Sequence, residues 1–187
     1  MAPAIETARL KLIPLQLEDA KQTQPLFGTW DVVKYLNGNV PWPYPAGAAH
    51  AYYRDVAIPA IERGDEWHWT LRLKEATNQI IGGVALHRHE TNNRGFWMGA
   101  AWRRRGLMLE AVEAATDYWF ESLGFQELRA PKASENIASV RISEKTGMRL
   151  LARQDQSFVS GILPAEVWVI TRDEWLRRKR SGRQSPS

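Results

Sequence analysis

Apolar and polar positions either alternate or recur with a helical period along most of the chain, and these patterns predict its elements. Alternation predicts strands in the first part of the chain, over residues 9–13, 67–73, 80–89 and 95–98. Helical spacing predicts helices over residues 17–27, 30–36 and 46–63. Pro59 should bend or split the third of these helices. An antiparallel meander that leads into a helix is typical of an α+β fold.

A strand, a basic turn and an amphipathic helix follow one another between Gly95 and Gly124. The helix has one apolar face, formed by positions 108, 111, 112, 115, 118, 119 and 123. Gly124 suits a left-handed helix cap. The turn before the helix holds arginines at 103, 104 and 105 and then Gly106. Its backbone N–H groups and the helix dipole favour phosphate, although a glycine after arginines more often marks only a helix start.

The second half of the chain carries further strand and helix signals. A strand is predicted over 128–132 although Pro131 cannot donate to a ladder. Asn136 suits an N-cap and Gly147 the position after the same helix. Residues 148–152 and 166–170 should form a closing hairpin with a long loop. Thr171 and Glu174 have the spacing of a capping box, which predicts a last short helix.

The composition is that of a globular protein and excludes several classes of site. The 187 residues, 44% of them hydrophobic, suffice for one domain with a core. The absence of cysteine excludes disulfides, zinc–thiolate sites and a thiol nucleophile. No apolar run has the length of a membrane span and the N-terminus does not resemble a signal peptide, so we expect a cytoplasmic protein without a membrane partner.

Positive charge is concentrated at the C-terminus. The net charge is +4, and five basic residues lie in the last eleven positions: Arg177, Arg178, Lys179, Arg180 and Arg183. Removing these five charges from +4 leaves the rest of the chain at −1. We therefore expect residues 177–187 to be a solvated, frayed tail after a single domain over 1–176. Nucleic acid is a disfavoured partner, because no aromatic–basic motif accompanies the tail.

Two motifs in the expected order resemble those of the GNAT superfamily of N-acetyltransferases. The first is Arg103-x-x-Gly106-x-Met108, where Met108 departs from the usual small residue, after a Gly95-Phe-Trp-Met strand. The second runs from Asn136 to Lys145-x-Gly-Met, with Met148 in place of Phe. Together they resemble the ribosomal-protein N-terminal acetyltransferase branch over roughly residues 7–175. The resemblance implies a mixed, mostly antiparallel sheet flanked by helices, whose central strands splay apart at Pro131; a plain strand end fits Pro131 equally well.

The resemblance also implies that acetyl-CoA is the co-substrate and that an amine is acetylated. Without a cysteine, the amine should attack the thioester directly in a ternary complex. The expected acceptor is a protein N-terminus or a small-molecule amine. A homodimer is one of the assemblies that the resemblance allows. A catalytically weak acyl-CoA-binding module is the alternative. The residues expected to bind acetyl-CoA are Trp97, Met98, Arg103, Arg104, Arg105, Gly106, Leu107, Met108, Asn136 and Lys145, with the amides near Trp97 and Met98 polarising the thioester.

Ser139 is the expected catalytic residue. Many family members use a tyrosine in the second motif to protonate the thiolate, but that position is Ser143 here. In the branch resembled, the serine three residues after the asparagine is the candidate acid, and this is Ser139. The alternative is that Ser139 only bonds the backbone at the helix start.

Several side chains are candidates for the general base. The glutamate of that branch aligns with Ser157, and Asp155 lies nearby. His87, His89 and Glu90 at a strand end are alternatives, as is His68, and the amine could also lose its proton to water. A metal is not expected, because His87 and His89 supply only two ligands.

An aromatic segment is expected to form the acceptor pocket with the sheet. Its candidate residues are Trp30, Asp31, Trp42 and Tyr44, and the carboxylate of Asp31 would attract a cationic amine. The competing interpretation is a small aromatic core under a proline-stiffened loop.

Overall fold

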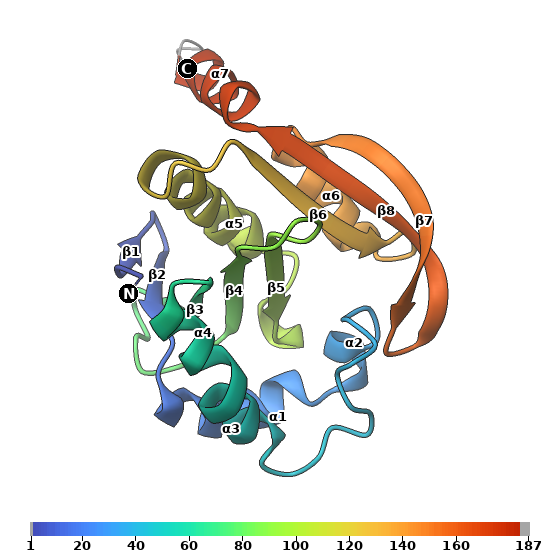
Figure 1. Ribbon diagram of the computed structural model, residues 1–187. Helices are drawn as coiled ribbons and strands as arrows, with labels where there is room; N and C mark the ends of the chain where they lie inside the picture. The colour runs from blue at the N-terminus through green and yellow to red at the C-terminus, as the bar shows by residue number, and fades with distance from the viewer. Residues whose placement is uncertain (1, 184–187) are drawn as a thin grey trace.

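The computed structural model describes residues 2–183 and has two antiparallel sheets with helices around them (Figure 1). The first sheet has the order β1-β2-β3-β4-β5, formed by Ile5–Glu6, Leu10–Pro14, Glu66–Leu73, Gly82–His87 and Arg94–Met98. The second has the order β6-β8-β7, formed by Glu127–Ala133, Gly161–Thr171 and Arg149–Phe158. The α-helices are α1 Ala20–Phe27, α2 Trp30–Val33, α3 Ala48–Tyr52, α4 Ile58–Arg63, α5 Leu107–Asp117, α6 Ile137–Lys145 and α7 Arg172–Arg183. This is the mixed GNAT-like fold that the sequence predicts.

The two sheets meet at β5 and β6 and then diverge. At the meeting point Asn93 N donates to Arg129 O at 2.7 Å, and Arg129 N donates to Asn93 Oδ1 at 2.7 Å. Beyond it the strands open toward α2 (Figure 1). Because N–H groups of alternate residues face the same edge, Pro131 has the same orientation as Arg129 and faces the opening. Its missing N–H therefore costs no ladder bond, which is why a proline is tolerated here.

The main core lies between the first sheet and α5. The side chains of Ala111, Val112 and Ala115 are fully buried, as the predicted apolar face requires. The helix begins after Gly106, which has φ +74°, and then widens into a π-helical turn over Tyr118–Ser122. Gly124 has φ +73°, so the left-handed cap is confirmed. The turn, strand and helix of this stretch thus form as the sequence predicts.

The hairpin of the second sheet differs from its prediction. β7 ends at Phe158 and β8 begins at Gly161, so only two residues separate the strands instead of the predicted long loop. β7 lies at an edge and most of its residues are exposed. Neither of its faces is consistently apolar, and therefore it carries no alternation that a sequence pattern could detect.

The C-terminal segment also differs from its prediction. α7 continues through Arg183 instead of fraying after residue 176, and residues 184–187 of the predicted tail lie outside the described residues. Ion pairs hold two of the basic residues: Arg178 contacts Glu113 at 2.7 Å, and Lys179 contacts Asp117 and Glu121 at 2.7 and 2.6 Å. The capping box between Thr171 and Glu174 is confirmed. Over residues 2–183, none of the helices combines the length and apolar character of a membrane span.

Candidate active site

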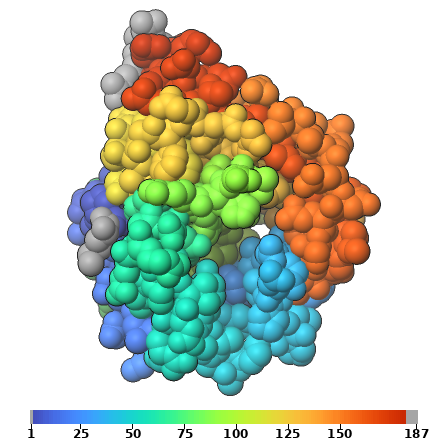
Figure 2. Space-filling view, in the orientation of Figure 1, coloured from blue at the N-terminus to red at the C-terminus, as the bar shows by residue number. Residues whose placement is uncertain are grey.

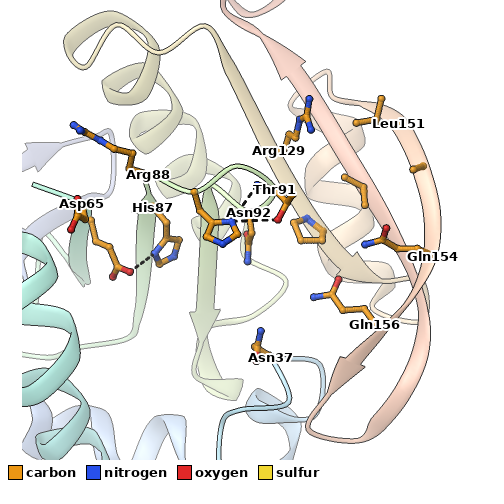
Figure 3. Close-up of a pocket in the computed structure, with 15 residues that line it drawn as sticks. Asn37, Asp65, His87, Arg88, Thr91, Asn92, Arg129, Leu151, Gln154 and Gln156 are labelled. Atoms are coloured by element: carbon orange, nitrogen blue, oxygen red, sulfur yellow. Dashed lines mark hydrogen bonds and ion pairs between the residues drawn. The ribbon is translucent and has the colours of Figure 1, made fainter.

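A polar cavity of about 580 Å³ opens where the two sheets diverge. Its walls come from the end of β4, the β4–β5 connection, β6, β7 and the segment after α2 (Figure 3). A narrower space of about 120 Å³ adjoins it and reaches α6. Asn37, Asn92, Pro131 and Gln156 line both spaces, so the two are neighbours. Figure 2 shows a small opening in the surface between the segments coloured green, orange and light blue.

The edge of β5 that faces this opening presents free backbone N–H groups. Hydrogen bonds from His87 N to Asn93 O and from Gly99 N to Ile81 O show that the Asn93 carbonyl and the Gly99 N–H face β4. In an antiparallel ladder the facing alternates, so Trp97 also faces β4, whereas Phe96 and Met98 face the opening. An extended ligand in the opening would therefore meet the N–H groups of Phe96 and Met98. The Trp97 amide, which the sequence analysis included, is turned away from it.

The basic turn before α5 is exposed, and Arg9, the residue just before β2, holds it in place. Arg9 Nε donates to Glu110 Oε2 at 2.7 Å, and Arg9 N donates to Glu110 Oε1 at 2.7 Å. Arg9 Nη1 also donates to the carbonyl of Arg105 at 2.8 Å. Burial opposes ionisation of Glu110 and raises its pKa, but the hydrogen bonds from Thr7 and Arg9 together outweigh this effect and lower the pKa. The carboxylate and Arg9 together fix the turn against the first turn of the helix.

The three arginines of the turn have different surroundings. Arg103 donates from Nε to Met98 O at 3.0 Å and from Nη2 to Asp31 O at 3.1 Å, so its guanidinium joins the turn to β5 and α2. Arg104 and Arg105 are exposed and form no ion pair within the described part of the chain. Arg104 has φ +62°. Arg104 and Arg105 therefore supply positive charge for binding an anion, next to the exposed Gly106.

The remaining predicted acetyl-CoA residues divide between core and surface. Leu107 and Met108 are buried in the main core, so only their backbone groups could reach a ligand. Asn136 lines the narrower space, and its Oδ1 accepts from Ser139 N at 3.2 Å, which confirms the N-cap. Lys145 is exposed at the other end of α6, about 13 Å along the helix from Asn136.

Ser139 is buried on the first turn of α6 and lines the narrower space. Its hydroxyl accepts from the ammonium of Lys132, with Nζ 3.4 Å from Oγ. Burial, together with the positive charge of Arg94, lowers the pKa of Lys132 well below its ordinary value. Ser143, one helical turn further on, is fully buried, and its Oγ has no partner among the described residues. The two serines are therefore not equivalent.

A glutamate between two histidines forms one wall of the larger cavity. Glu66 and His68 share a face of β3, and the register places His87 of β4 opposite Glu66. Glu66 lies 2.5 Å from His68 Nε2 and 3.3 Å from His87 Nδ1. Burial tends to raise the pKa of Glu66, but the hydrogen bonds from both histidines outweigh this effect and lower the pKa. Burial lowers the pKa of His68.

This arrangement leaves the second nitrogen of His87 directed at β5. A Cβ built on Gly95 would lie 3.5 Å from His87 Nε2, so that nitrogen lies above Gly95. His87 Nδ1 is occupied by Glu66, which orients the ring for proton transfer at Nε2. The three ligand atoms also lie within 4.8 Å of one another, a spacing that a metal could use. Their mutual hydrogen bonds account for the cluster without an ion.

The other base candidates lie outside the cavity or at its edge. His89 is exposed, and its Nδ1 accepts from Thr91 N at 3.2 Å; Glu90 is also exposed. On β7 the side chains of Gln154 and Gln156 point into the cavity (Figure 3). Because side chains alternate along a strand, Asp155 and Ser157 point to the other face. The position aligned with the family's glutamate therefore does not face the cavity, whereas its neighbour Gln156 does.

Carboxamides dominate the wall opposite His87. Asn37, Gln154 and Gln156 are directed at the same space from the segment after α2 and from β7 (Figure 3). Asn92 Oδ1 and Gln156 Oε1 are buried and have no partner among the described residues. A buried carbonyl oxygen without a donor is unfavourable, so both oxygens would gain from a ligand N–H group.

The predicted acceptor residues do not line either space. Trp30 and Trp42 are each more than two-fifths exposed and pack on one another at 5.1 Å. Asp31 is paired with Lys34 at 3.4 Å, and Tyr44 packs on Phe27. The predicted segment does reach the cavity, but through Asn37 and, on the narrower side, through Tyr35 and Leu36. The small aromatic core is thus the interpretation that the structure favours for Tyr44.

Four side chains at the site were missed by sequence reasoning: Arg9, Glu66, Arg94 and Lys132. Lys132 had one usable signal, because a lysine next to Pro131 in an apolar strand of the central sheet breaks the pattern of a buried element. Glu66 is in register with His87, but register is not visible in a single sequence.

Comparisons with known proteins agree with this geometry. The family of acetyltransferase (GNAT) domains matches residues 9–149. YjcK of Bacillus subtilis, described as a probable N-acetyltransferase, is 28% identical over 92 residues, 46% of this chain and half of that protein. YoaA of B. subtilis, an uncharacterized N-acetyltransferase, is 26% identical over 153 residues, 80% of this chain and 84% of that protein.

Solved structures share the fold at low identity. The ribosomal-protein-S5-alanine acetyltransferase of Vibrio fischeri superposes with a TM-score of 0.78 at 12% identity, covering 93% of this chain and 99% of that one. The spermidine N-acetyltransferase of Vibrio cholerae, in complex with CoA and spermine, gives 0.76 at 16% identity, covering 91% and 99%. The family match spans most of the chain, includes the basic turn and ends just after the second motif. The chain therefore belongs to the GNAT acetyltransferase family and is an acyl-CoA-dependent N-acetyltransferase.

Proposed function

We propose that this protein transfers the acetyl group of acetyl-CoA to the primary amine at a polypeptide N-terminus, by direct attack in a ternary complex. The observation that carries the proposal is the opening between β5 and β6. On one side it has the free edge of β5 and Ser139; on the other it has the carboxamide-lined cavity. Two ligands that enter from opposite sides would meet there.

The residues present fit acetyl-CoA. The start of α5 offers unpaired backbone N–H groups and the exposed Arg104 and Arg105, which suit a diphosphate. The free edge of β5 would bind the pantetheine arm as an added strand. The N–H groups of Phe96 and Met98 would then polarise the thioester carbonyl.

Ser139 is the catalytic residue of this proposal. Its hydroxyl oxygen accepts from Lys132, so its own proton is free to be donated to the departing sulfur. His87 is the base that we propose for the attacking amine, because its Nε2 is directed at β5 and Glu66 orients it. The chain has no cysteine, which is consistent with direct transfer.

The charges of the cavity support a peptide acceptor. The carboxylates that line it are Glu66, bonded by two histidines, and Asp65, paired with Arg63 at 2.9 Å. Neither is free to neutralise a polycation such as a polyamine. Carboxamides, by contrast, match the alternating donors and acceptors of a peptide backbone. A carboxamide beside the amine also avoids favouring its unreactive ammonium form, which a carboxylate would stabilise.

A small-molecule amine is the second candidate acceptor. The observation that favours it is the size of the cavity, because about 580 Å³ lies within the range of small-molecule pockets. Relatives in the comparisons include both a ribosomal-protein and a spermidine acetyltransferase.

The test is release of CoA thiol from acetyl-CoA with a panel of N-terminal peptides, amino acids and polyamines. We expect turnover with peptides and little with polyamines. Ser139→Ala should lower kcat about 10²-fold, or about 2.7 kcal/mol, with little change in acetyl-CoA affinity. Ser143→Ala is the matched control, and its effect should be much smaller. Tight acetyl-CoA binding without turnover on any acceptor would instead identify a binding module that has lost catalysis.

A further inference from the structure

A lysine is buried inside the opening between the two sheets. Lys132 lies on β6 and only 5% of it is exposed. Its Nζ lies 3.4 Å from Ser139 Oγ and 3.5 Å from the Ser139 carbonyl oxygen, and it sits over the ring of Phe96 at 5.8 Å. Burying an ammonium group is costly unless the charge is paired and hydrogen-bonded. No carboxylate within the described residues forms an ion pair with it.

We propose that Lys132 positions the Ser139 hydroxyl and supplies the proton that this hydroxyl passes to the thiolate of CoA. The inference rests on the proposed function, since Ser139 must face the departing sulfur. A serine hydroxyl alone is too weak an acid to protonate a thiolate. A lysine ammonium hydrogen-bonded to it removes that difficulty, because the hydroxyl then only relays a proton.

The charges around Lys132 match this role. Arg94 of β5 lines the same narrow space and is fully buried, and its Nε has no partner among the described residues. Burial lowers the pKa of Arg94 to about 10. Burial and Arg94 lower the pKa of Lys132, while Glu166 of β8, opposite Lys132 in the ladder, acts in the reverse direction. Two buried cationic side chains therefore line the narrow space in which the proposal places the leaving sulfur.

The lowered pKa also improves proton transfer. An ordinary thiol has a pKa of about 8.5 and an ordinary lysine about 10.4, so an unperturbed ammonium would hold its proton too tightly. Lowering the lysine pKa brings the two groups closer together, which is the condition for efficient general acid catalysis.

Every proton that is transferred in the proposed reaction has a donor and an acceptor. The amine nitrogen forms a bond to the acetyl carbon and loses one proton to His87. The carbon–sulfur bond breaks, and its electron pair stays on the sulfur. Ser139 gives its hydroxyl proton to the sulfur while Lys132 gives one to Ser139 Oγ. Neutral Lys132 then takes up a proton from solvent, and His87 releases one.

The experiment compares Lys132→Met, Lys132→Arg and the exposed control Lys21→Met with wild type. We measure kcat from thiol release between pH 6 and 10 and acetyl-CoA affinity by calorimetry, and we check folding by circular dichroism. Lys132→Met should lower kcat about 10- to 10²-fold with little change in affinity. In wild type, kcat should fall as pH rises through the lowered pKa of Lys132, because the donor is lost. That alkaline limb should be absent in Lys132→Met and shifted upward in Lys132→Arg.

Coupling to Ser139 separates this role from mere packing. Adding Lys132→Met to Ser139→Ala should cause no further loss of kcat, since both act on the same proton. Multiplicative losses, or an alkaline limb that persists in Lys132→Met, would overturn the proposal. If Lys132→Met does not fold, an NMR titration of Lys132 in wild type replaces it, and its midpoint must coincide with the alkaline limb. If the wild-type protein shows no turnover, the proposed function is wrong, and so is the role of Lys132 that depends on it. If the wild type is active and the Lys132 variants keep its kcat, only the role of Lys132 is wrong.

Discussion

At the scale of single residues, Glu66 shows how two strands build one functional group. It shares a face of β3 with His68, and the register of β3 and β4 places it against His87. The buried His68 fixes the carboxylate from behind, and the carboxylate fixes the ring of His87. From the sequence alone, His87 is one of several candidate bases. The register of β3 and β4 places Glu66 against His87 and not against His89, and this register depends on both strands.

This geometry predicts that His87→Ala lowers kcat/KM for the acceptor about 10²-fold, because the amine loses its proton acceptor. His89→Ala is the matched control, two residues further on and exposed. It should change kcat/KM by less than about twofold. Initial rates at saturating acetyl-CoA measure both, and equal losses in the two variants would show that His87 is not the base.

At the scale of elements, the basic turn depends on the residue just before β2 as much as on α5. Arg9 fastens the carbonyl of Arg105 and the carboxylate of Glu110, although almost a hundred residues separate it from the turn. The start and apolar face of α5 and the caps of α6 follow from local sequence, and they are as predicted. The clamp from Arg9 is not local, and therefore no spacing rule could reveal it.

Arg9→Met should therefore raise the KM for acetyl-CoA about fivefold, or about 1 kcal/mol, while kcat at saturation changes little. The estimate is modest because half of the Arg9 side chain is exposed. Lys11→Met, two residues further along the chain and in an exposed pair with Glu6, should leave this KM unchanged. A similar rise in both variants would indicate a general effect of surface charge instead of a clamp.

At the scale of the whole molecule, the site is enclosed by a ring of non-local contacts. Arg103 joins the turn after β5 to α2. The segment after α2 then bonds the tip of the second sheet, where Gly38 N donates to Ser157 O at 3.2 Å and Val159 N to Leu36 O at 3.0 Å. Asn93 closes the ring back to β6. The sequence predicted the segment but not its partner, because β7 has no apolar alternation. The predicted acceptor residues of this segment lie outside the two spaces, which the segment reaches through Asn37 instead.

This ring gives the last prediction, at Gly38. A Cβ there would overlap Ser157 Oγ and press on Ser157 Cβ at 3.3 Å and Phe158 O at 3.4 Å. Gly38→Ala should push the segment away from β7, carrying Asn37 out of the cavity wall. The acceptor KM should rise while the acetyl-CoA KM stays the same, because α5 and β5 lie on the other side of the opening. Overpacking of about 1 kcal/mol should lower the Tm by roughly 3 °C.

A second substitution can reverse the effect, which makes the test specific. Ser157→Ala removes the oxygen that the new methyl group would overlap and leaves the backbone bond from Gly38 N to Ser157 O in place. The double variant should therefore regain most of the acceptor KM and of the Tm. Steady-state kinetics with each substrate varied in turn, together with thermal unfolding, measure both quantities. If Gly38→Ala changes the two KM values equally, or if Ser157→Ala restores neither, the ring does not shape the acceptor site.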